Sequence, residues 1–378
     1  MKISPFLIGR YFAQWELNIP YFLSTADVEN YQLEELLALA DEESRDLWRH
    51  LSLGYTATAG HPLLRAAIAS LYAGVEPDEI LVFAGGEEAI FVLLSALLES
   101  GDHAVVVWPT YQSLYEVGRA VGAEVTLVPL AADAGWSLDI RAVQRALRPT
   151  TRVIVVNFPH APTGALPDHA TFAALCDLAH EAGAYLFCDE SFRYLELDPL
   201  DRLPAAVEAG LSGISLGAMS KAFGLGGLRI GWLASHDLEL IRRVLAFKDY
   251  TSVSNSAPSE ILALIALRSR NVILARSLGV IRQNLAHFDN FFARWSEVYS
   301  WVRPRAGSVG FPRLHLDVPI DHFISALVEQ EEVLLVPGSV YEYPGSHFRV
   351  GFGRVDLPMV LERFDRFTRT YLQTMPGA

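Results

Sequence analysis

A single lysine in a glycine-rich, apolar segment is the residue of this sequence best suited to covalent chemistry. The segment Ser215–Trp232 reads SLGAMSKAFGLGGLRIGW, with Lys221 before a glycine-rich turn and Arg229 eight residues later. An amine on such a turn forms an imine with an aldehyde cofactor when burial or nearby cations lower its pKa. A guanidinium close by holds a phosphate dianion through paired, charge-assisted hydrogen bonds. The lysine and the arginine of this segment could therefore hold an aldehyde cofactor that carries a phosphate.

Two further segments carry groups that would bind the same kind of ligand. The apolar run that ends in Cys188-Asp189-Glu190 predicts a strand, and ligands of doubly wound sheets bind at the carboxyl ends of strands. The segment Phe83–Ile90, FAGGEEAI, follows another strand and opens a helix. Exposed amides at a helix N-terminus, with glycines that allow close approach, make an anion site. The sequence thus predicts a carboxylate and a phosphate site near the lysine.

Together these segments resemble the class I and II aminotransferases and their relatives, the fold-type I enzymes that use pyridoxal 5′-phosphate (PLP). The similarity extends from about Tyr55 to Arg349, with the motifs in the family's order. It implies that Lys221 carries PLP as a Schiff base and shuttles the proton between the substrate Cα and C4′. It also implies that Asp189 keeps the pyridine nitrogen protonated, so that the ring accepts electrons. The other contacts with the cofactor that it implies come from Gly86, Glu87, Ser220 and Arg229.

Three more residues match positions with a role in that family. Tyr111, which ends Trp-Pro-Thr-Tyr, matches the aromatic residue stacked on the pyridine ring. Tyr55, in GYTATAGHPLLR, resembles the tyrosine that reaches the phosphate of the neighbouring subunit, which implies a homodimer with shared active sites. Arg349, in FRVGFG, matches the arginine that binds the substrate's α-carboxylate as a bidentate pair.

The sequence departs from the family pattern at three positions near the cofactor. Ala161 in NFPHAPTG replaces an asparagine, and Phe192 in DESF replaces a tyrosine; both missing groups donate hydrogen bonds to the cofactor's O3′. Ala218 replaces a Ser or Thr that contacts phosphate. Without donors to O3′ the imine keeps its proton to higher pH, so we expect a yellow enzyme across neutral pH. Other donors, such as His160 or an ordered water, would change this expectation, and an engineered replacement at position 161 would give the same sequence.

Transamination of an amino acid with a 2-oxo acid is the default reaction that the resemblance implies. The alternative is a PLP enzyme that does not transaminate: a cyclase, an eliminase or an amino-acid oxidase. The NFPH loop, Phe192 and the run from Phe22 to Asp27 are similar to capreomycidine synthase and related cyclases that act on hydroxylated arginine. An arginine-like substrate needs carboxylates to pair its guanidinium, and Glu16, Asp27 and Glu29 are available. The sequence leaves the substrate side chain open.

The composition argues against several other classes of protein. The 378 residues carry a net charge of −14 without a cluster of Lys or Arg, so we expect no nucleic-acid partner. The apolar runs are too short to span a bilayer, and the 11 histidines lack a metal-ligand spacing. There is no room for a DNA-binding module before Tyr55, which argues against a ligand-sensing regulator. The two cysteines, Cys176 and Cys188, predict free thiols in a cytoplasmic protein.

The elements that position these residues follow from the hydrophobic pattern. Short β-branched runs alternate with amphipathic stretches from about residue 60, which predicts βαβ units around a mostly parallel sheet. We expect an α/β fold: a three-layer αβα domain with a seven-stranded sheet over residues 51–280, and a smaller α+β domain over 281–378. Residues 1–50 are expected to pack on the small domain and the active site, and one long helical stretch is expected from Pro258 to Trp295. The strands expected in the sheet are Glu79–Phe83, Ala104–Val107, Glu124–Val128, Arg152–Val156, Ala184–Cys188, Gly213–Leu216 and Leu228–Leu233.

Overall fold

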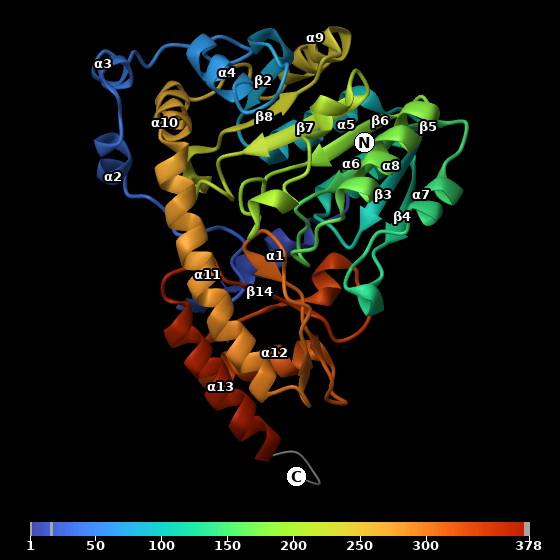
Figure 1. Ribbon diagram of the computed structural model, residues 1–378, viewed down its shortest axis with the longest axis vertical. Helices are drawn as coiled ribbons and strands as arrows, with labels where there is room; N and C mark the ends of the chain where they lie inside the picture. The colour runs from blue at the N-terminus through green and yellow to red at the C-terminus, as the bar shows by residue number, and fades with distance from the viewer. Residues whose placement is uncertain (1, 16–17, 374–378) are drawn as a thin grey trace.

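The computed structural model describes residues 2–15 and 18–373, and a seven-stranded sheet forms its larger part (Figure 1). The strand order is β2-β8-β7-β6-β5-β3-β4, and all neighbours are parallel except that β8 is antiparallel to both β2 and β7. The mostly parallel, seven-stranded sheet predicted from the sequence is confirmed. Its strands are β2 (Ile80–Phe83), β3 (His103–Trp108), β4 (Glu124–Pro129), β5 (Thr151–Asn157), β6 (Tyr185–Asp189), β7 (Gly213–Ala218) and β8 (Gly231–Ala234).

Helices cover both faces of this sheet because successive strand side chains point to opposite faces and both sets are apolar. On one face, residues such as Leu81 and Phe83 pack against α5, α6 and α9. On the other face, Val105 and Val107 pack against α7 and α8. The helices are α5 (Gly86–Leu97), α6 (Ser113–Val121), α7 (Ile140–Ala146), α8 (His169–Glu181) and α9 (Leu238–Lys248). The three-layer αβα arrangement is therefore confirmed.

The long helical stretch expected after residue 257 is two helices, α10 (Ala257–Arg268) and α11 (Arg270–Arg294). Ser269 leaves the helical conformation, with φ −101° and ψ 16°, and its hydroxyl donates a hydrogen bond of 3.0 Å to the Leu39 carbonyl. A serine that bonds to a backbone outside its own helix favours a helix end over a helix interior. The domain boundary that we propose at residue 280 falls inside α11, which runs from the sheet-bearing part to the smaller part (Figure 1).

The smaller part combines short strands with helices, and the N-terminal segment packs on it. A three-stranded sheet has the order β10-β14-β13, β11 pairs with β9, and β1 pairs with β12 in parallel. Helix α1 lies between this part and the large sheet (Figure 1). The remaining α-helices and strands of the described residues are α1 (Leu7–Trp15), β1 (Tyr21–Phe22), α2 (Leu33–Ala38), α3 (Glu42–Arg49), α4 (Pro62–Ala69), β9 (Tyr299–Ser300), β10 (Val309–Gly310), β11 (Arg313–Leu314), α12 (Ile320–Glu331), β12 (Val333–Leu334), β13 (Val336–Pro337), β14 (Phe348–Gly351) and α13 (Leu357–Gln373).

Candidate cofactor and substrate site

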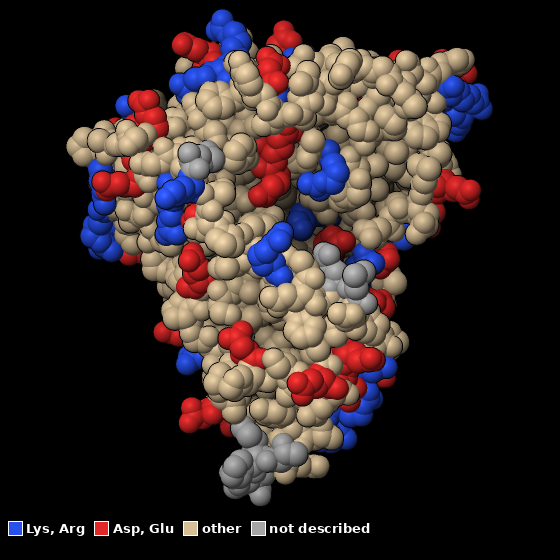
Figure 2. All heavy atoms as spheres, turned by 180° about the vertical axis from the view of Figure 1, so that it is seen from behind, with Lys and Arg blue, Asp and Glu red and all other residues tan. Residues whose placement is uncertain are grey.

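A cavity of about 420 Å³ lies where β5, β6 and β7 end, and residues of the N-terminal segment and the smaller part line its other side. The space-filling view from behind shows a hollow in this face of the molecule with basic side chains in and beside it (Figure 2). Eight of the nine predicted site residues line the cavity, and Tyr55 does not. Its wall consists of Phe6, Ile8, Gly9, Phe12, Thr25, Ala26, Asp27, Gly86, Glu87, Ile90, Tyr111, Asn157, Ala161, Asp189, Ser191, Phe192, Leu216, Ala218, Ser220, Lys221, Arg229, Tyr341 and Arg349.

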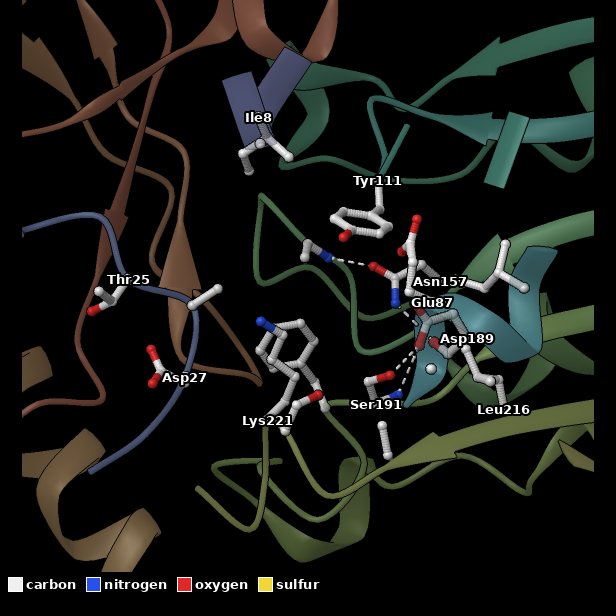
Figure 3. A pocket seen from close by; sticks show the side chains of 18 of the residues that line it. Ile8, Thr25, Asp27, Glu87, Tyr111, Asn157, Asp189, Ser191, Leu216 and Lys221 are labelled. Atoms are coloured by element: carbon white, nitrogen blue, oxygen red, sulfur yellow. Dashed lines mark hydrogen bonds between the residues drawn. The ribbon is translucent and has the colours of Figure 1, made fainter. Parts of the chain in front are cut away.

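Lys221 stands on the turn that follows β7, and its amine reaches the cavity (Figure 3). Burial lowers the pKa of this amine, and the positive charges of Arg349 and Arg229 lower it further, whereas Asp27 and Asp189 oppose the shift. A lowered pKa increases the fraction of neutral amine, which is the form that attacks a carbonyl carbon. The structure therefore gives this lysine the environment that its chemistry requires.

Asp189 ends β6 and is buried at the cavity wall. Its Oδ1 accepts hydrogen bonds from the backbone N–H (3.0 Å) and the hydroxyl (2.6 Å) of Ser191. Burial raises the pKa of the carboxyl, and the bonds from Ser191 and the charge of Lys221 counteract the rise. Asn157 fixes the neighbouring loop, since its amide donates to the Asp189 carbonyl (2.8 Å) and accepts from the Ala161 N–H (2.7 Å). Asp189 is thus a carboxylate in a fixed orientation that could accept a hydrogen bond from a protonated ring nitrogen.

The N-terminus of α5 and the side chain of Arg229 lie together at the cavity wall. Gly85 precedes the helix with φ 96°, and no side chain caps the helix there. Arg229 takes a left-handed conformation (φ 52°), which is uncommon for a residue with a side chain, and β8 therefore begins only at Gly231 rather than at Leu228 as expected. A Cβ on Gly85 would lie 2.4 Å from Arg229 Nη2, so the guanidinium packs directly on the bare backbone. Helix amides and a guanidinium converge here as a phosphate requires.

Arg349, on β14, is 5% exposed and is held by two hydrogen bonds. Its Nε donates to the Ser24 carbonyl (2.9 Å), and its Nη1 donates to the Tyr341 hydroxyl (2.6 Å). These bonds orient a planar guanidinium at the cavity wall, where it can bind a carboxylate in bidentate fashion. Neither contact was predicted from the sequence. Ser24 lies 325 residues from Arg349, and Tyr341 belongs to no motif, so only the folded chain shows that both bind the guanidinium.

A profile of the family described as aminotransferase class I and II matches residues 27–364, which includes the cavity residues from Asp27 to Arg349. The chain belongs to this family. It is a PLP-dependent enzyme of the aminotransferase type that acts on an amino acid, and the resemblance stated from the sequence motifs is confirmed.

The relatives of this aminotransferase include enzymes with more than one kind of reaction. Capreomycidine synthase from Streptomyces vinaceus is 31% identical over 334 residues, which cover 87% of this chain and 84% of that protein. A solved PLP-dependent aminotransferase from Streptococcus suis has a TM-score of 0.92 at 31% identity, with 98% of this chain and 99% of that chain covered. A solved PLP-dependent cyclase, OrfR, has a TM-score of 0.89 at 28% identity, with 98% of each chain covered.

The cavity of this aminotransferase fits PLP on structural grounds. The bare backbone at Gly85 leaves a cradle for a phosphate beside Arg229, and Asp189 offers a buried carboxylate to a ring nitrogen. When bound, PLP supplies an aldehyde that condenses with an amine and a ring that accepts electrons from a bond broken at the substrate Cα. Lys221 is the amine of the cavity.

The residues that depart from the family pattern also line the cavity. Ala161, Phe192 and Ala218 all contribute to its wall, so the two groups that would donate to O3′ are absent from their usual places. His160 does not replace them. It is buried outside the cavity lining with Nδ1 2.8 Å from the Thr163 hydroxyl, and burial lowers its pKa to about 3.

Of the three carboxylates considered for an arginine-like substrate, Asp27 lines the cavity, with its Oδ2 3.5 Å from Arg354 Nη1. Glu29 instead accepts a hydrogen bond from the Val355 N–H (3.0 Å). Glu16 lies outside the described residues. Within residues 2–15 and 18–373, no helix is long and apolar enough to cross a membrane, and no cluster of His, Cys, Asp or Glu could hold a metal ion.

Tyr55 lies away from this chain's own cavity and is 95% exposed. The predicted role of this tyrosine, at the phosphate of a neighbouring subunit, remains a prediction. Sequence reasoning also missed the apolar part of the wall that comes from Phe6, Ile8 and Phe12. The spacing of four between Ile8 and Phe12 is a helical signal, but nothing in the sequence tells which surface such a helix covers.

Proposed function

We propose that this aminotransferase transaminates an amino acid with a 2-oxo acid as acceptor, using Lys221 as the cofactor-bearing base. The observation that carries the proposal is that Lys221, Asp189, Arg229 and Arg349 line one cavity although they come from three separate segments of the sequence. PLP requires an amine for its aldehyde, a carboxylate for its ring nitrogen and a cation for its phosphate. The amino acid requires a cation for its α-carboxylate.

Each side chain has a role that its position supports. Lys221 would hold the cofactor and, once released, take up and return the proton at the substrate Cα. Asp189 would pair with the ring nitrogen, and Tyr111 would lie against the ring. Arg349 would bind the substrate α-carboxylate. The phosphate would be held by Gly86, Glu87, Ser220 and Arg229.

Reductive labelling tests the assignment of Lys221. Borohydride treatment of the cofactor-loaded protein should fix a pyridoxyl group on Lys221, as read by mass spectrometry of the peptide around it. The Lys221→Ala variant should lose the visible absorbance band and turnover. A label on another lysine would overturn the assignment.

We further propose that the enzyme is a cytoplasmic homodimer in which Tyr55 completes the partner's phosphate site. Support comes from large apolar side chains that are exposed in the single chain, among them Leu53 (83%), Tyr55 (95%) and Tyr250 (93%). Large apolar and aromatic side chains that a single chain exposes are typical of protein interfaces. Cys176 and Cys188 are free thiols, which suits a reducing compartment.

A second candidate function is a ring-forming reaction on an arginine-like substrate. Two observations favour it: the similarity to capreomycidine synthase and OrfR, and the position of Asp27 in the cavity wall. A carboxylate there could pair with a guanidinium. Product analysis distinguishes the two functions. Transamination with 2-oxoglutarate yields a new amino acid and a 2-oxo acid, whereas the second function yields a cyclised product without consumption of 2-oxoglutarate.

A further inference from the structure

Residues 4–15 cover one side of the cavity, and we call this segment the roof. Its apolar side chains in the cavity wall are Phe6, Ile8 and Phe12. All three side chains line the cavity although they stand far in sequence from the other wall residues. In the close view, Ile8 projects from α1 toward the space that Tyr111, Asp189 and Lys221 surround (Figure 3). The roof therefore lies opposite the groups that would hold the cofactor.

The roof is held to the large part by two buried side chains, those of Gln112 and Glu116. Gln112 is 6% exposed, and its carboxamide bonds to two points of the N-terminal backbone. Its Oε1 accepts from the Leu7 N–H (2.7 Å) and its Nε2 donates to the Pro5 carbonyl (3.0 Å). A second buried residue, Glu116, accepts from the Ser4 N–H (3.0 Å). A buried amide with both ends bonded to a terminal segment orders backbone that would otherwise fray.

The other end of the roof is bound to the smaller part, and its middle contacts functional side chains. The Tyr11 hydroxyl donates to the Leu335 carbonyl (2.7 Å). The ring of Phe6 meets the ring of Tyr111, the residue before Gln112, edge to face at 5.3 Å between centroids. The guanidinium of Arg349 lies 5.8 Å from the centroid of the Phe12 ring. The roof thus touches the residues assigned to the cofactor ring and to the substrate carboxylate.

We propose that Gln112 is a positioning residue that fixes this roof, and that the roof selects amino acids whose side chain has an apolar stem. The inference rests on the proposed function, in which Arg349 binds the α-carboxylate. Because the Arg349 guanidinium lies 5.8 Å from the centroid of the Phe12 ring, we place the substrate side chain along Phe12 and Ile8, which line the same cavity. Burial of an apolar stem against these side chains stabilises the bound substrate, because apolar surface leaves water. A short acidic side chain finds no positive charge on Phe6, Ile8 or Phe12 to offset the loss of its hydration.

The first test replaces Gln112. Gln112→Leu keeps the size of the side chain and removes both hydrogen bonds, and Gln144→Leu, on the exposed surface of α7, is the matched control. In cofactor-loaded protein, trypsin should cleave after the exposed Arg10 about tenfold faster in Gln112→Leu, because two net hydrogen bonds no longer oppose local opening. The control should be cleaved at the wild-type rate. Equal cleavage in all three proteins would overturn the role of Gln112, and this readout does not depend on which reaction is catalysed.

The second test moves the roof without touching Gln112. A Cβ on Gly9 would lie 2.8 Å from Phe6 Cδ1, so Gly9→Ala should push the Phe6 ring away from Tyr111. For amino acids with apolar stems, both Gly9→Ala and Gln112→Leu should raise KM about threefold to tenfold, with a smaller change in kcat. For aspartate, KM should change less than twofold in both variants. An equal KM change for aspartate and leucine would exclude the roof as a specificity element. If no amino acid were turned over by any variant or the wild type, the proposed function would fail and the trypsin result would stand alone.

Discussion

Glu190 follows Asp189 directly and is buried, yet it does not line the cavity. Its Oε1 accepts from the Ala206 N–H (2.7 Å) and the Ser215 hydroxyl (2.7 Å), whereas its Oε2 has no hydrogen-bond partner among the described residues. Burial raises the pKa of Glu190 to about 7, although Arg193 and the two bonds oppose the rise. This carboxyl therefore titrates close to neutral pH in the folded protein.

The Glu190→Gln substitution should change how stability depends on pH. The folded pKa (about 7) lies above the ordinary value of 4.5, so the stability contribution of Glu190 is fully present below pH 4.5 and is lost as pH rises through 7. Glutamine keeps the accepting oxygen and has no proton to lose. The free energy of unfolding of Glu190→Gln relative to wild type should therefore increase by up to about 3 kcal/mol between pH 5 and pH 8. Urea denaturation at the two pH values measures it.

The exposed Glu181→Gln variant is the control for this prediction, and its difference from wild type should be the same at both pH values. A pH-independent difference for Glu190→Gln as well would contradict the predicted titration of the buried carboxyl.

Among single residues, those inside local motifs could be identified from the sequence and those that act by contact could not. Lys221 and Arg229 share one short segment, and their types alone indicate an imine and a phosphate. Tyr341 and Phe12, which flank Arg349, belong to no motif, and their importance follows only from distances in the folded chain. Glu87 was assigned through its backbone, whereas its side chain also turns into the cavity and accepts a hydrogen bond from the Ser113 hydroxyl.

At the scale of elements, the sheet strands were predictable because both faces are buried and the strands are nearly continuous apolar runs. The errors fall where one residue changes the backbone direction. Ser269 divides the expected long helix, and the left-handed Arg229 delays the start of β8. The two-residue strand β9 was not predicted, since strands this short exist through their partners and not through their own pattern.

The N-terminus of α5 gives a prediction at this scale. Gly85 and Gly101 both have φ 96°, but a Cβ would meet Arg229 Nη2 at Gly85 and nothing within 4 Å at Gly101. Both Gly→Ala variants should lose about 1–3 kcal/mol of stability, because alanine is strained at this φ. Only Gly85→Ala should weaken PLP binding, by about tenfold, since it displaces the guanidinium of the anion site. Fluorescence titration of the apoenzyme with PLP measures the dissociation constant. Equal dissociation constants for the two variants would contradict the proposal that the cofactor phosphate binds beside Gly85 and Arg229.

At the scale of the whole molecule, the architecture of two parts joined by α11 follows from how apolar stretches alternate along the chain. What encloses the cavity does not follow from that pattern. Its wall draws on residues 6–27, on the ends of several sheet strands and on β14, so it exists only once the parts are packed together. The proposed partner subunit would add one more contributor, Tyr55, which stands 95% exposed on the single chain.

A mixing experiment tests whether two chains share each site. If Tyr55 serves the partner's phosphate site, Tyr55→Ala and Lys221→Ala should each be inactive or nearly so as homodimers. Unfolding and refolding an equal mixture gives a heterodimer in about half of the molecules, and one of its two sites then has both native side chains. Activity should recover to about a quarter of wild type per site. Each protein refolded alone is the control and should stay at its own low level. A mixture no more active than the average of the two variants would exclude a shared site, because each chain would then need its own Tyr55.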